Sequence, residues 1–316
     1  MTETGTRCGA NGGSASIKAS VVELVDNGVP DLAGGDTATR WDRLYEWARR
    51  GSVSAARLAE AHLDATAILA EAGHSADPDA SVYGVWASSP GSTATLSKDH
   101  TVVRGIKPFC SGVGLVDRAL VTVTDLDSEQ GCLVEIDTAN LKPPPPWAGH
   151  ALRDTLTGPA DLGSCRVVRT IGTADWYLDR PGFWHGALGP AACWAGAAAG
   201  LVDAALRDPS EDPHRLAAHG ELTALRISME SVLEAAGAAT DRDPTDRSKA
   251  KQRALASRHI IERTASAIAD LYSRTVGPRP FVSDPDVVQR HADLHLYVRQ
   301  HHGARDLELL GRSVAT

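Results

Sequence analysis

The sequence has no run of about 20 consecutive apolar residues, the length that a membrane-spanning helix requires. Its start, MTETGTRCGANGGSAS, lacks the apolar stretch of a secretory signal peptide. The five cysteines are far apart and form no Cys-x-x-Cys pair, which argues against a disulfide framework and a zinc ribbon. The formal net charge is −8, so broad attraction to nucleic acid or to an acidic membrane surface is not expected. We therefore expect a cytoplasmic protein with neither nucleic acid nor membrane as a partner.

Aromatic residues are also few, at 5% of 316 residues, yet a hydrophobic fraction of 42% is ordinary for a globular protein. Gly, Ser and Thr near the N-terminus predict a disordered or irregular tail over residues 1–35. In residues 36–78, Trp41, Leu44 and Trp47 recur at helical spacing, so this segment is expected to be a short helical domain.

Residues 79–173 have a different pattern of apolar residues. Short β-branched segments such as RALVTVTDL (118–126) and GCLVEIDT (131–138) are broken by Gly or Asp, which is typical of strands in a sandwich or barrel. The stretch LKPPPPWAGH (141–150) predicts an extended polyproline conformation, which cannot lie in a central strand. This part of the chain is therefore expected to form a β domain.

Residues 174–316 are predicted to form four long helices joined by short connections, the pattern of an up-and-down bundle. The first, over 182–206, is so rich in Ala and Gly that we place it inside the bundle. The last is predicted to run without a break from Asp284, a possible N-cap, to Gly311. The predicted fold class is α+β multidomain: a short helical segment, a β domain and a four-helix bundle.

Three local strings in the β domain stand in a characteristic order. VWASSPG (85–91) is followed by GIKPFCSG (105–112) and then by LRDTLTGPADLGSCRV (152–167). Together with the order of elements, these strings resemble the acyl-CoA dehydrogenase superfamily over roughly residues 37–312. The resemblance implies a central antiparallel β-barrel, and FAD bound between the barrel and the bundle.

The resemblance also implies roles for individual residues. A flavin needs hydrogen bonds to its ring and an aromatic wall that excludes water. The first two strings imply that the flavin is contacted by Trp86, Ser88, Ser89, Phe109 and Ser111. The third implies that Arg153 and Thr155, with Thr157 beside them, support the substrate side of the site. The alternative to flavin contacts is a purely structural role, in which SSPG forms an ordinary turn and Phe109 is a core residue.

Several features of that family are missing. The helical segment is shorter than is usual there, which argues against a long fatty acyl substrate. The family's Gln-x-x-Gly-Gly-x-Gly string is replaced by TVGPRPFVSD (275–284), where Arg279 is a new cation that could contact the cofactor and two prolines remove backbone donors. FMN, or no flavin, therefore stays open beside FAD. The catalytic Glu of the family falls at His301-His302-Gly303, and its alternative position falls near Gly189-Pro190; neither is acidic.

Histidines are the remaining candidates for chemistry. His302 could act as a base, because an unperturbed imidazole has a pKa of about 6.5. His185 is the second candidate, because it begins the first bundle helix near the expected flavin and substrate. His291, His295 and His302 recur at i, i+4 and i+11, so they are expected to share a helix face. With no acidic residue on that face within one turn, we predict no metal site there. A hydrated face or a packed helix seam explains the same spacing.

The function expected from the resemblance is a flavin-dependent oxidoreductase that oxidises a small or modified acyl thioester with a non-standard base. A flavin monooxygenase of the same fold is a close variant. The alternative is a catalytically degenerate structural or regulatory subunit that pairs with an active paralogue. A homodimer or homotetramer is expected in either case.

Overall fold

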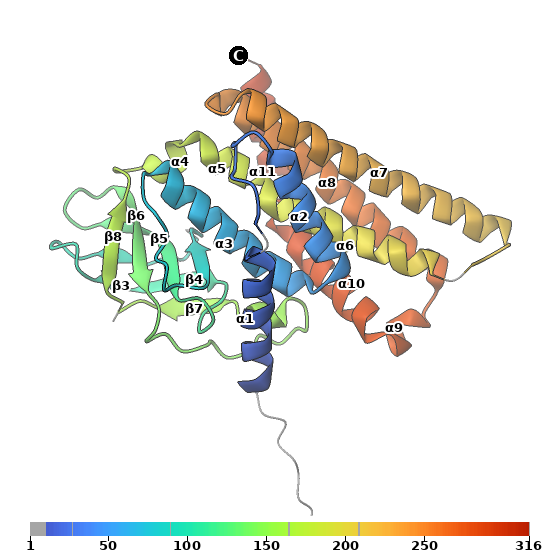
Figure 1. The fold of residues 1–316 in the computed structure, drawn as a ribbon, viewed down its shortest axis with the longest axis horizontal. Coiled ribbons are helices and arrows are strands. Elements are labelled where there is room, and N and C mark those ends of the chain that lie inside the picture. The colour runs from blue at the N-terminus through green and yellow to red at the C-terminus, as the bar shows by residue number, and fades with distance from the viewer. Residues whose placement is uncertain (1–10, 27, 89, 164, 208, 316) are drawn as a thin grey trace, which may run out of the picture.

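The computed structural model describes residues 11–315 except 27, 89, 164 and 208, with the backbone alone for residues 11–15. Strands gather on one side of the molecule and long helices on the other (Figure 1). Helix α3 (Val53–Glu71) lies between these layers and contacts both the strand β1 (Tyr83–Trp86) and the helix α6 (Leu188–Leu206). No helix in the described ranges is both long and apolar enough to cross a membrane.

The first helix lies where the sequence predicted an irregular tail. Helix α1 (Asn11–Val25) occupies the middle of residues 1–35, so the expectation is wrong for residues 11–25. Ile17 and Val21 are one turn apart on α1 and are both buried in the core of the β layer, where α1 also contacts α3. Burial of this apolar pair stabilises a helix that its Gly- and Ser-rich sequence alone does not favour. Residues 1–10 lie outside the described residues.

Helices α2 (Thr37–Arg50) and α3 follow. The apolar face of α2 buries Trp41, Leu44 and Tyr45, at the spacing that predicted a helix. Helix α3 begins after Ser52, whose side chain accepts a hydrogen bond from the backbone N–H of Ala55. Helix α2 packs on α6 and on the next long helix, which joins the N-terminal helices to the helical layer.

The β layer is a mixed sheet with a separate two-stranded ribbon. Its remaining strands are β2 (Thr95–Leu96), β3 (Val103–Arg104), β4 (Ile106–Cys110), β5 (Arg118–Asp125), β6 (Gly131–Asp137), β7 (Gly158–Asp161) and β8 (Val167–Ile171). Five strands follow the order β3-β2-β5-β6-β8, β1 also pairs with β5, and β4 pairs only with β7.

The expected antiparallel barrel is not confirmed in its details, because the strands are not all antiparallel. Strands β1 and β2 both lie parallel to β5, while β6 lies antiparallel to it. The two ends of the larger sheet meet at an isolated antiparallel bridge between Val102, beside β3, and Arg166, beside β8. The layer is therefore a mixed sheet whose end strands are joined by this bridge.

The helical layer begins with two short helices, α4 (Trp176–Asp179) and α5 (Pro181–Gly186), before α6. It continues with α7 (Pro213–Arg242), α8 (Arg247–Val276), α9 (Pro280–Ser283), α10 (Pro285–Tyr297) and α11 (Ala304–Val314). Asp212, Asp246 and Asp284 cap α7, α8 and α10 by accepting backbone N–H bonds. Helices α6, α7, α8 and α10 pack against one another.

Two of the predicted helices are interrupted. The segment 182–206 divides into α5 and α6, because the ring of Pro190 conflicts with the carbonyl four residues earlier in a continuous helix. The segment 284–311 divides into α10 and α11, separated by the 3-10 turn η2 (Val298–Gln300), an extended His301 and Gly303 with φ of +58°. Only glycine adopts that last conformation readily.

Helix α6 is buried along nearly its whole length. A Cβ atom on Gly196 would lie 2.0 Å from the carbonyl oxygen of Tyr45 on α2. A Cβ atom on Gly237 of α7 would lie 2.5 Å from the Cα atom of Ala38. Both distances are far below van der Waals contact, so glycine at these positions sets how closely α2 approaches α6 and α7.

We predict that Gly196→Ala lowers the free energy of unfolding by about 1–3 kcal/mol, because the added methyl group forces α2 away from α6. The matched control is Gly220→Ala on α7, where a Cβ atom meets nothing within 4 Å. That control is expected to stabilise the protein by about 0.5–1 kcal/mol, the usual gain in helix propensity. Urea denaturation measures both. Equal stability of the two variants would show that α2 and α6 are not packed backbone to backbone.

Candidate functional site

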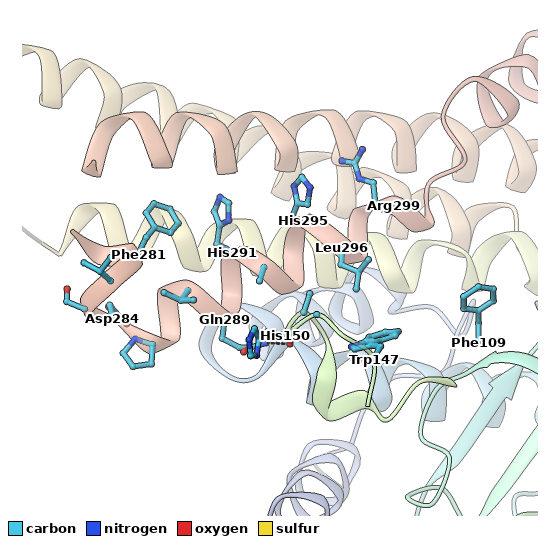
Figure 2. Close-up of a pocket in the computed structure, with 17 residues that line it drawn as sticks. Phe109, Trp147, His150, Phe281, Asp284, Gln289, His291, His295, Leu296 and Arg299 are labelled. Carbon is cyan, nitrogen blue, oxygen red and sulfur yellow. Dashed lines mark hydrogen bonds between the residues drawn. The ribbon is translucent and has the colours of Figure 1, made fainter. Parts of the chain in front are cut away.

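A large pocket of about 1370 Å³ opens between the β layer and the helical layer. It exceeds the roughly 300–1,000 Å³ that is usual for a small-molecule site. We call it the interlayer pocket. Phe109 of β4 stands at one end, Trp147 in the middle, and α9 and α10 form the opposite wall (Figure 2). Its lining also includes Gly149, His150, Ala151, Phe281, Val282, Ser283, Asp284, Pro285, Val288, Gln289, His291, Ala292, His295, Leu296 and Arg299.

Phe109 is presented to the pocket by an irregular strand. The register of β4 against β7 shifts between Lys107 and Cys110, and both of these residues are buried. The Lys107 ammonium donates to the carbonyl oxygen and to Oγ1 of Thr122, both at 2.7 Å. With its neighbours turned inward, Phe109 adopts a φ of +54° and leaves its side chain 66% exposed. A large exposed aromatic residue in the left-handed region is costly, which makes Phe109 a candidate site residue.

Trp147 is placed by the polyproline segment. A Cβ atom on Gly114 would lie 2.5 Å from Cγ of Pro143, and one on Gly158 would lie 2.5 Å from Cβ of Pro144. The two glycines therefore let the extended segment lie directly on the β layer. The half-buried indole at its end reaches the interlayer pocket.

The helical wall of the pocket carries two imidazoles and one guanidinium. His291, His295 and Arg299 follow one another at intervals of four residues and extend from the same side of the chain (Figure 2). Nε2 of His291 lies 3.2 Å from Oγ of Ser273, and the ring of Phe281 meets the imidazole edge to face at 5.0 Å. Burial lowers the pKa of His291, so its neutral form is favoured.

Asp293 ties the two walls together. Its Oδ1 accepts one bond from the backbone N–H of Leu152 and another from Nε2 of Gln289, both at 2.6 Å. Gln289 also donates to the carbonyl oxygen of His150 at 3.1 Å. Burial raises the pKa of Asp293 to about 6, because the low-dielectric surroundings disfavour its charge.

Asp284 is the only carboxylate among the lining residues that the structure describes. Its Oδ1 accepts the backbone N–H groups of Asp286 and Val287, and its Oδ2 lies 3.4 Å from Arg207. These bonds occupy the carboxylate as the N-cap of α10. The proton acceptors left in the lining are imidazoles.

Some of the residues predicted for the site do meet. Trp86 is buried and donates from Nε1 to the carbonyl oxygen of Ser111 at 2.9 Å. Oγ1 of Thr157 donates to Oγ of Ser111 at 2.8 Å and lies 2.7 Å from Oγ1 of the buried Thr155. Thr155 donates in turn to the carbonyl oxygen of Leu152. The hydroxyl groups thus form a chain that connects the end of β4 to the segment held by Asp293.

Other predicted residues lie apart from this cluster. Arg153 is exposed in the 3-10 turn η1 (Arg153–Thr155), Arg279 is exposed before α9, and neither belongs to the pocket lining. Ser88 is half-buried after β1, and Ser89 lies outside the described residues. Their roles stay predictions.

The two candidate bases also lie outside the pocket lining. His185 is buried beside a different cavity of about 480 Å³, where Nε2 donates to the carbonyl oxygen of Pro244 at 3.0 Å and burial lowers its pKa. His302 has a side chain that is 64% exposed, and its Nδ1 lies 3.3 Å from Asp306. The expectation that His291, His295 and His302 share a helix face is wrong, because α10 ends at Tyr297.

The sequence analysis missed Trp147, His150 and Gln289 as parts of one site. Trp147 follows four prolines and could have been noticed as a large aromatic residue at the end of a rigid segment. No pattern in the sequence indicated that Gln289 and His150 meet, because 139 positions separate them.

The link through Asp293 predicts a specific dependence of stability on pH. The folded state holds the Asp293 proton more tightly than the unfolded chain does, so wild-type stability falls as the pH rises from about 4 to 6. Ionisation costs the folded state about 3 kcal/mol. Asp293→Asn lacks this cost, so its stability relative to wild type should rise across the same window, as measured by urea denaturation at a series of pH values. Asp286→Asn on the exposed side of α10 is the control and should track wild type. If the stability of Asp293→Asn changed with pH in the same way as that of wild type, the raised pKa could not belong to Asp293.

Comparison with solved structures identifies the fold. The dibenzothiophene monooxygenase TdsC from Paenibacillus sp. A11-2, solved with FMN and indole, matches with a TM-score of 0.76 and 18% identity, over 96% of this chain and 95% of that one. The methanesulfinate monooxygenase MsuC from Pseudomonas fluorescens matches with a TM-score of 0.72 and 17% identity, over 96% and 94%. Butyryl-CoA dehydrogenase from Megasphaera elsdenii matches with a TM-score of 0.73 and 12% identity, over the whole of both chains.

No protein-family model and no curated protein matches the sequence significantly. The similarity therefore lies in the arrangement of sheet and helices and not in sequence identity, which is 18% or less in these three structures. The chain has the fold of the acyl-CoA dehydrogenase superfamily, as its motifs predicted.

Proposed function

We propose that this protein is a flavin-dependent oxidoreductase that binds its flavin in the interlayer pocket. The observation that carries the proposal is the position of Phe109, held out from a buried strand in the left-handed region at the end of a large pocket. A strained, exposed aromatic residue is costly unless it covers a flat ligand. The fold, shared with the FMN-bound TdsC, gives independent support.

The lining of the pocket fits a flavin. Phe109 and Trp147 supply aromatic surfaces for a planar ring. Arg299, His291 and His295 on the opposite wall are donors suited to a phosphate group. Flavin bound there would supply two-electron chemistry, while the protein positions the ring and excludes water from it.

We propose FMN in preference to FAD. Between α8 and α10, Pro278 and Pro280 lack the backbone N–H groups that would bind a pyrophosphate. Arg279, the cation nearest to them in sequence, is exposed and does not line the pocket. The nitrogen donors of the pocket instead follow one another at intervals of four residues along α10 and η2, which suits a single phosphate group.

Among the reactions of this fold, we propose monooxygenation of a small apolar substrate. Oxidation of an acyl thioester requires a carboxylate that removes the α-proton, and the one carboxylate of the described lining, Asp284, is bonded as a helix cap. Neutral His291 can accept or release a proton without a fixed charge in the pocket. The similarity in fold to TdsC and MsuC, both monooxygenases, supports this choice.

Phe109→Gly is expected to weaken FMN binding at least tenfold, since the aromatic wall is lost. The variant should unfold within about 1 kcal/mol of wild type, because relief of about 1–2 kcal/mol of left-handed strain offsets the added freedom of glycine. Titration followed by flavin fluorescence measures the affinity for FMN and for FAD, and thermal unfolding measures the stability.

The matched control is Ile106→Ala, which removes another exposed apolar side chain from the same strand, outside the pocket. Its affinity for FMN should equal that of wild type. Wild-type protein that takes up neither FMN nor FAD would overturn the proposal and favour the structural or regulatory subunit.

Anaerobic mixing with acyl-CoA distinguishes the two reactions. A dehydrogenase transfers hydride from the thioester to the flavin and bleaches its absorbance without oxygen. We expect no bleaching with a series of acyl-CoA chain lengths, because no carboxylate is free in the described lining. Bleaching by any of these thioesters would refute monooxygenation and restore the dehydrogenase.

A further inference from the structure

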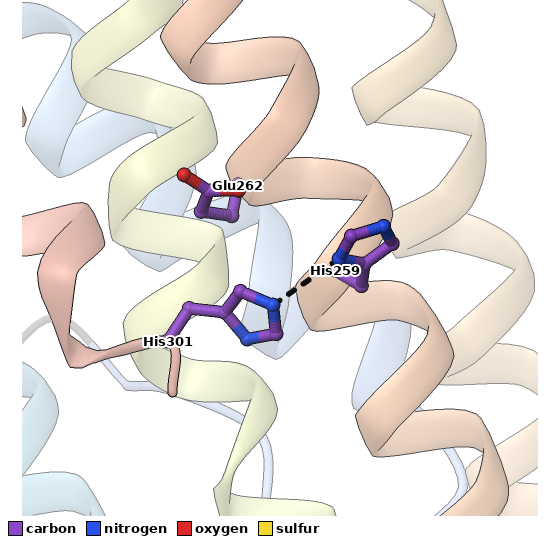
Figure 3. Close-up of side chains that lie close together, drawn as sticks. All are labelled: His259, Glu262 and His301. Atoms are coloured by element: carbon purple, nitrogen blue, oxygen red, sulfur yellow. Dashed lines mark hydrogen bonds between the residues drawn. The ribbon is translucent and has the colours of Figure 1, made fainter. Parts of the chain in front are cut away.

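A second group of side chains lies beside the helical layer, outside the lining of the interlayer pocket. His259 and Glu262 stand three residues apart on α8, and His301 faces them from the connection between η2 and α11 (Figure 3). One ligand atom from each residue lies within 4.8 Å of the other two. His301 is 9% exposed and Glu262 is 8% exposed, so two of the three groups are buried. We call these residues the His-Glu-His cluster.

The two imidazoles have the separation expected of ligands to one ion. Nδ1 of His259 and Nε2 of His301 lie 3.2 Å apart (Figure 3). Two nitrogens bound to zinc at about 2.0–2.1 Å in tetrahedral geometry lie roughly 3.3–3.4 Å apart. The alternative is a hydrogen bond in which one ring donates and the other accepts. The positions of the rings suit both.

The surroundings of His301 resemble the second shell of a metal site. Its other nitrogen, Nδ1, is buried without a hydrogen-bond partner among the described residues, and lies 3.1 Å from Oδ2 of Asp306, a carboxylate buried in the first turn of α11. A small rotation of the ring would bring the two into a hydrogen bond. Metal-binding histidines commonly donate their second ring N–H to such a carboxylate, which fixes the ring and strengthens the ligand.

The charges around the cluster leave room for a cation. Arg299 lies 3.2 Å from Oε1 of Glu262, and Ser266 donates to the same oxygen. Both contacts are made with Oε1 of Glu262. Arg258 is engaged elsewhere, donating to the carbonyl oxygens of Ala187 and Gln300 while its guanidinium lies over the ring of Trp194.

We propose that the His-Glu-His cluster binds one divalent transition-metal ion of the zinc class. Nδ1 of His259, Nε2 of His301 and a carboxylate oxygen of Glu262 are the ligands, and water completes the coordination. Two imidazoles and one carboxylate suit zinc or cobalt and not calcium or magnesium, which prefer oxygen alone. The ion would fasten the segment between η2 and α11 to α8.

The test uses full-length protein without a histidine tag, stripped of metal by a chelator and titrated with Zn²⁺ and Co²⁺ by calorimetry. One equivalent of each should bind, and Co²⁺ should show the intense visible absorption of a tetrahedral site. Zn²⁺ should also raise the melting temperature, because it binds the folded state preferentially. Absence of stoichiometric binding by wild-type protein would overturn the proposal.

His259→Ala should weaken Zn²⁺ binding at least 100-fold. His259 is only partly buried, so the variant is expected to fold. The control is His214→Ala, which removes an exposed histidine at the start of α7. It should bind Zn²⁺ like wild type, and equal loss in both variants would place the ion elsewhere and refute the cluster.

Two further variants separate a metal site from a simple hydrogen bond. Asp306→Asn should weaken Zn²⁺ binding by about 10–100-fold without removing a ligand. Arg299→Gln should instead tighten it, because a cation beside Glu262 is removed. A hydrogen-bonded histidine pair without a metal would give no Zn²⁺ affinity for either substitution to change, so affinities that do not move in these directions contradict the proposed ligands.

Discussion

The close approach of backbones around α6 is the constraint on which the rest of the structure depends. Small side chains let α2 lie directly on α6 at Gly196. A second glycine, Gly200, leaves space for the guanidinium of Arg290, which lies against α6 and donates to the carbonyl oxygens of Ala48 and Gly51 at the end of α2. This contact fixes the position of α10. Since α10 carries the nitrogen-bearing wall of the interlayer pocket, a glycine on a buried helix decides where that wall stands.

The opposite wall depends on the irregular register of the short strand β4. Lys107 and Cys110 are both buried, which the strand achieves only with an irregularity between them. Phe109 bears the resulting strain and projects outward. The Ser111, Thr157 and Thr155 hydroxyls then connect this strand to Leu152, and Asp293 connects Leu152 to α10. The two walls are thus linked through closely spaced hydroxyl groups and the Asp293 carboxylate, and such support is what a precisely positioned site requires.

The sequence predicted the features that follow from local periodicity and short motifs. The buried character of α6, the strands β5 and β6, the extended segment before Trp147 and the fold itself all follow from patterns within a few tens of residues. Predictions failed, or were not made, for features that depend on residues far apart in the sequence. The sheet is mixed because β1 and β2 lie parallel to β5, and helix α1 forms because Ile17 and Val21 find a core elsewhere. Neither event leaves a signal in the segment concerned.

The same limit applies to the candidate site. Phe109, Ser111 and Thr155 belong to motifs and could be named in advance, although what they contact could not. Gln289 and His150 meet across the fold, and His259 meets His301 across 42 positions, so no local spacing identifies them. The histidines of the last long segment illustrate the point. A regular helix would have aligned His295 with His302, but the break near Gly303 turns His302 outward and places its neighbour His301 against α8.

Buried charged side chains fill the space between α3 and α6 beside Glu60. Glu60 is 6% exposed and accepts a bond from Arg57 at 2.8 Å, and burial raises the pKa of Glu60 to about 7. Arg57 also lies over the ring of Tyr297. The cavity that remains beside Glu60 measures only about 10 Å³, too small for an acyl chain. Charged groups buried at this cost must remain paired, because removing one partner strands the other in a low dielectric. Charged side chains therefore fill the space beside Glu60, while a cavity of about 480 Å³ lined by Arg40, Glu71 and His185 remains elsewhere between the N-terminal helices and the helical layer.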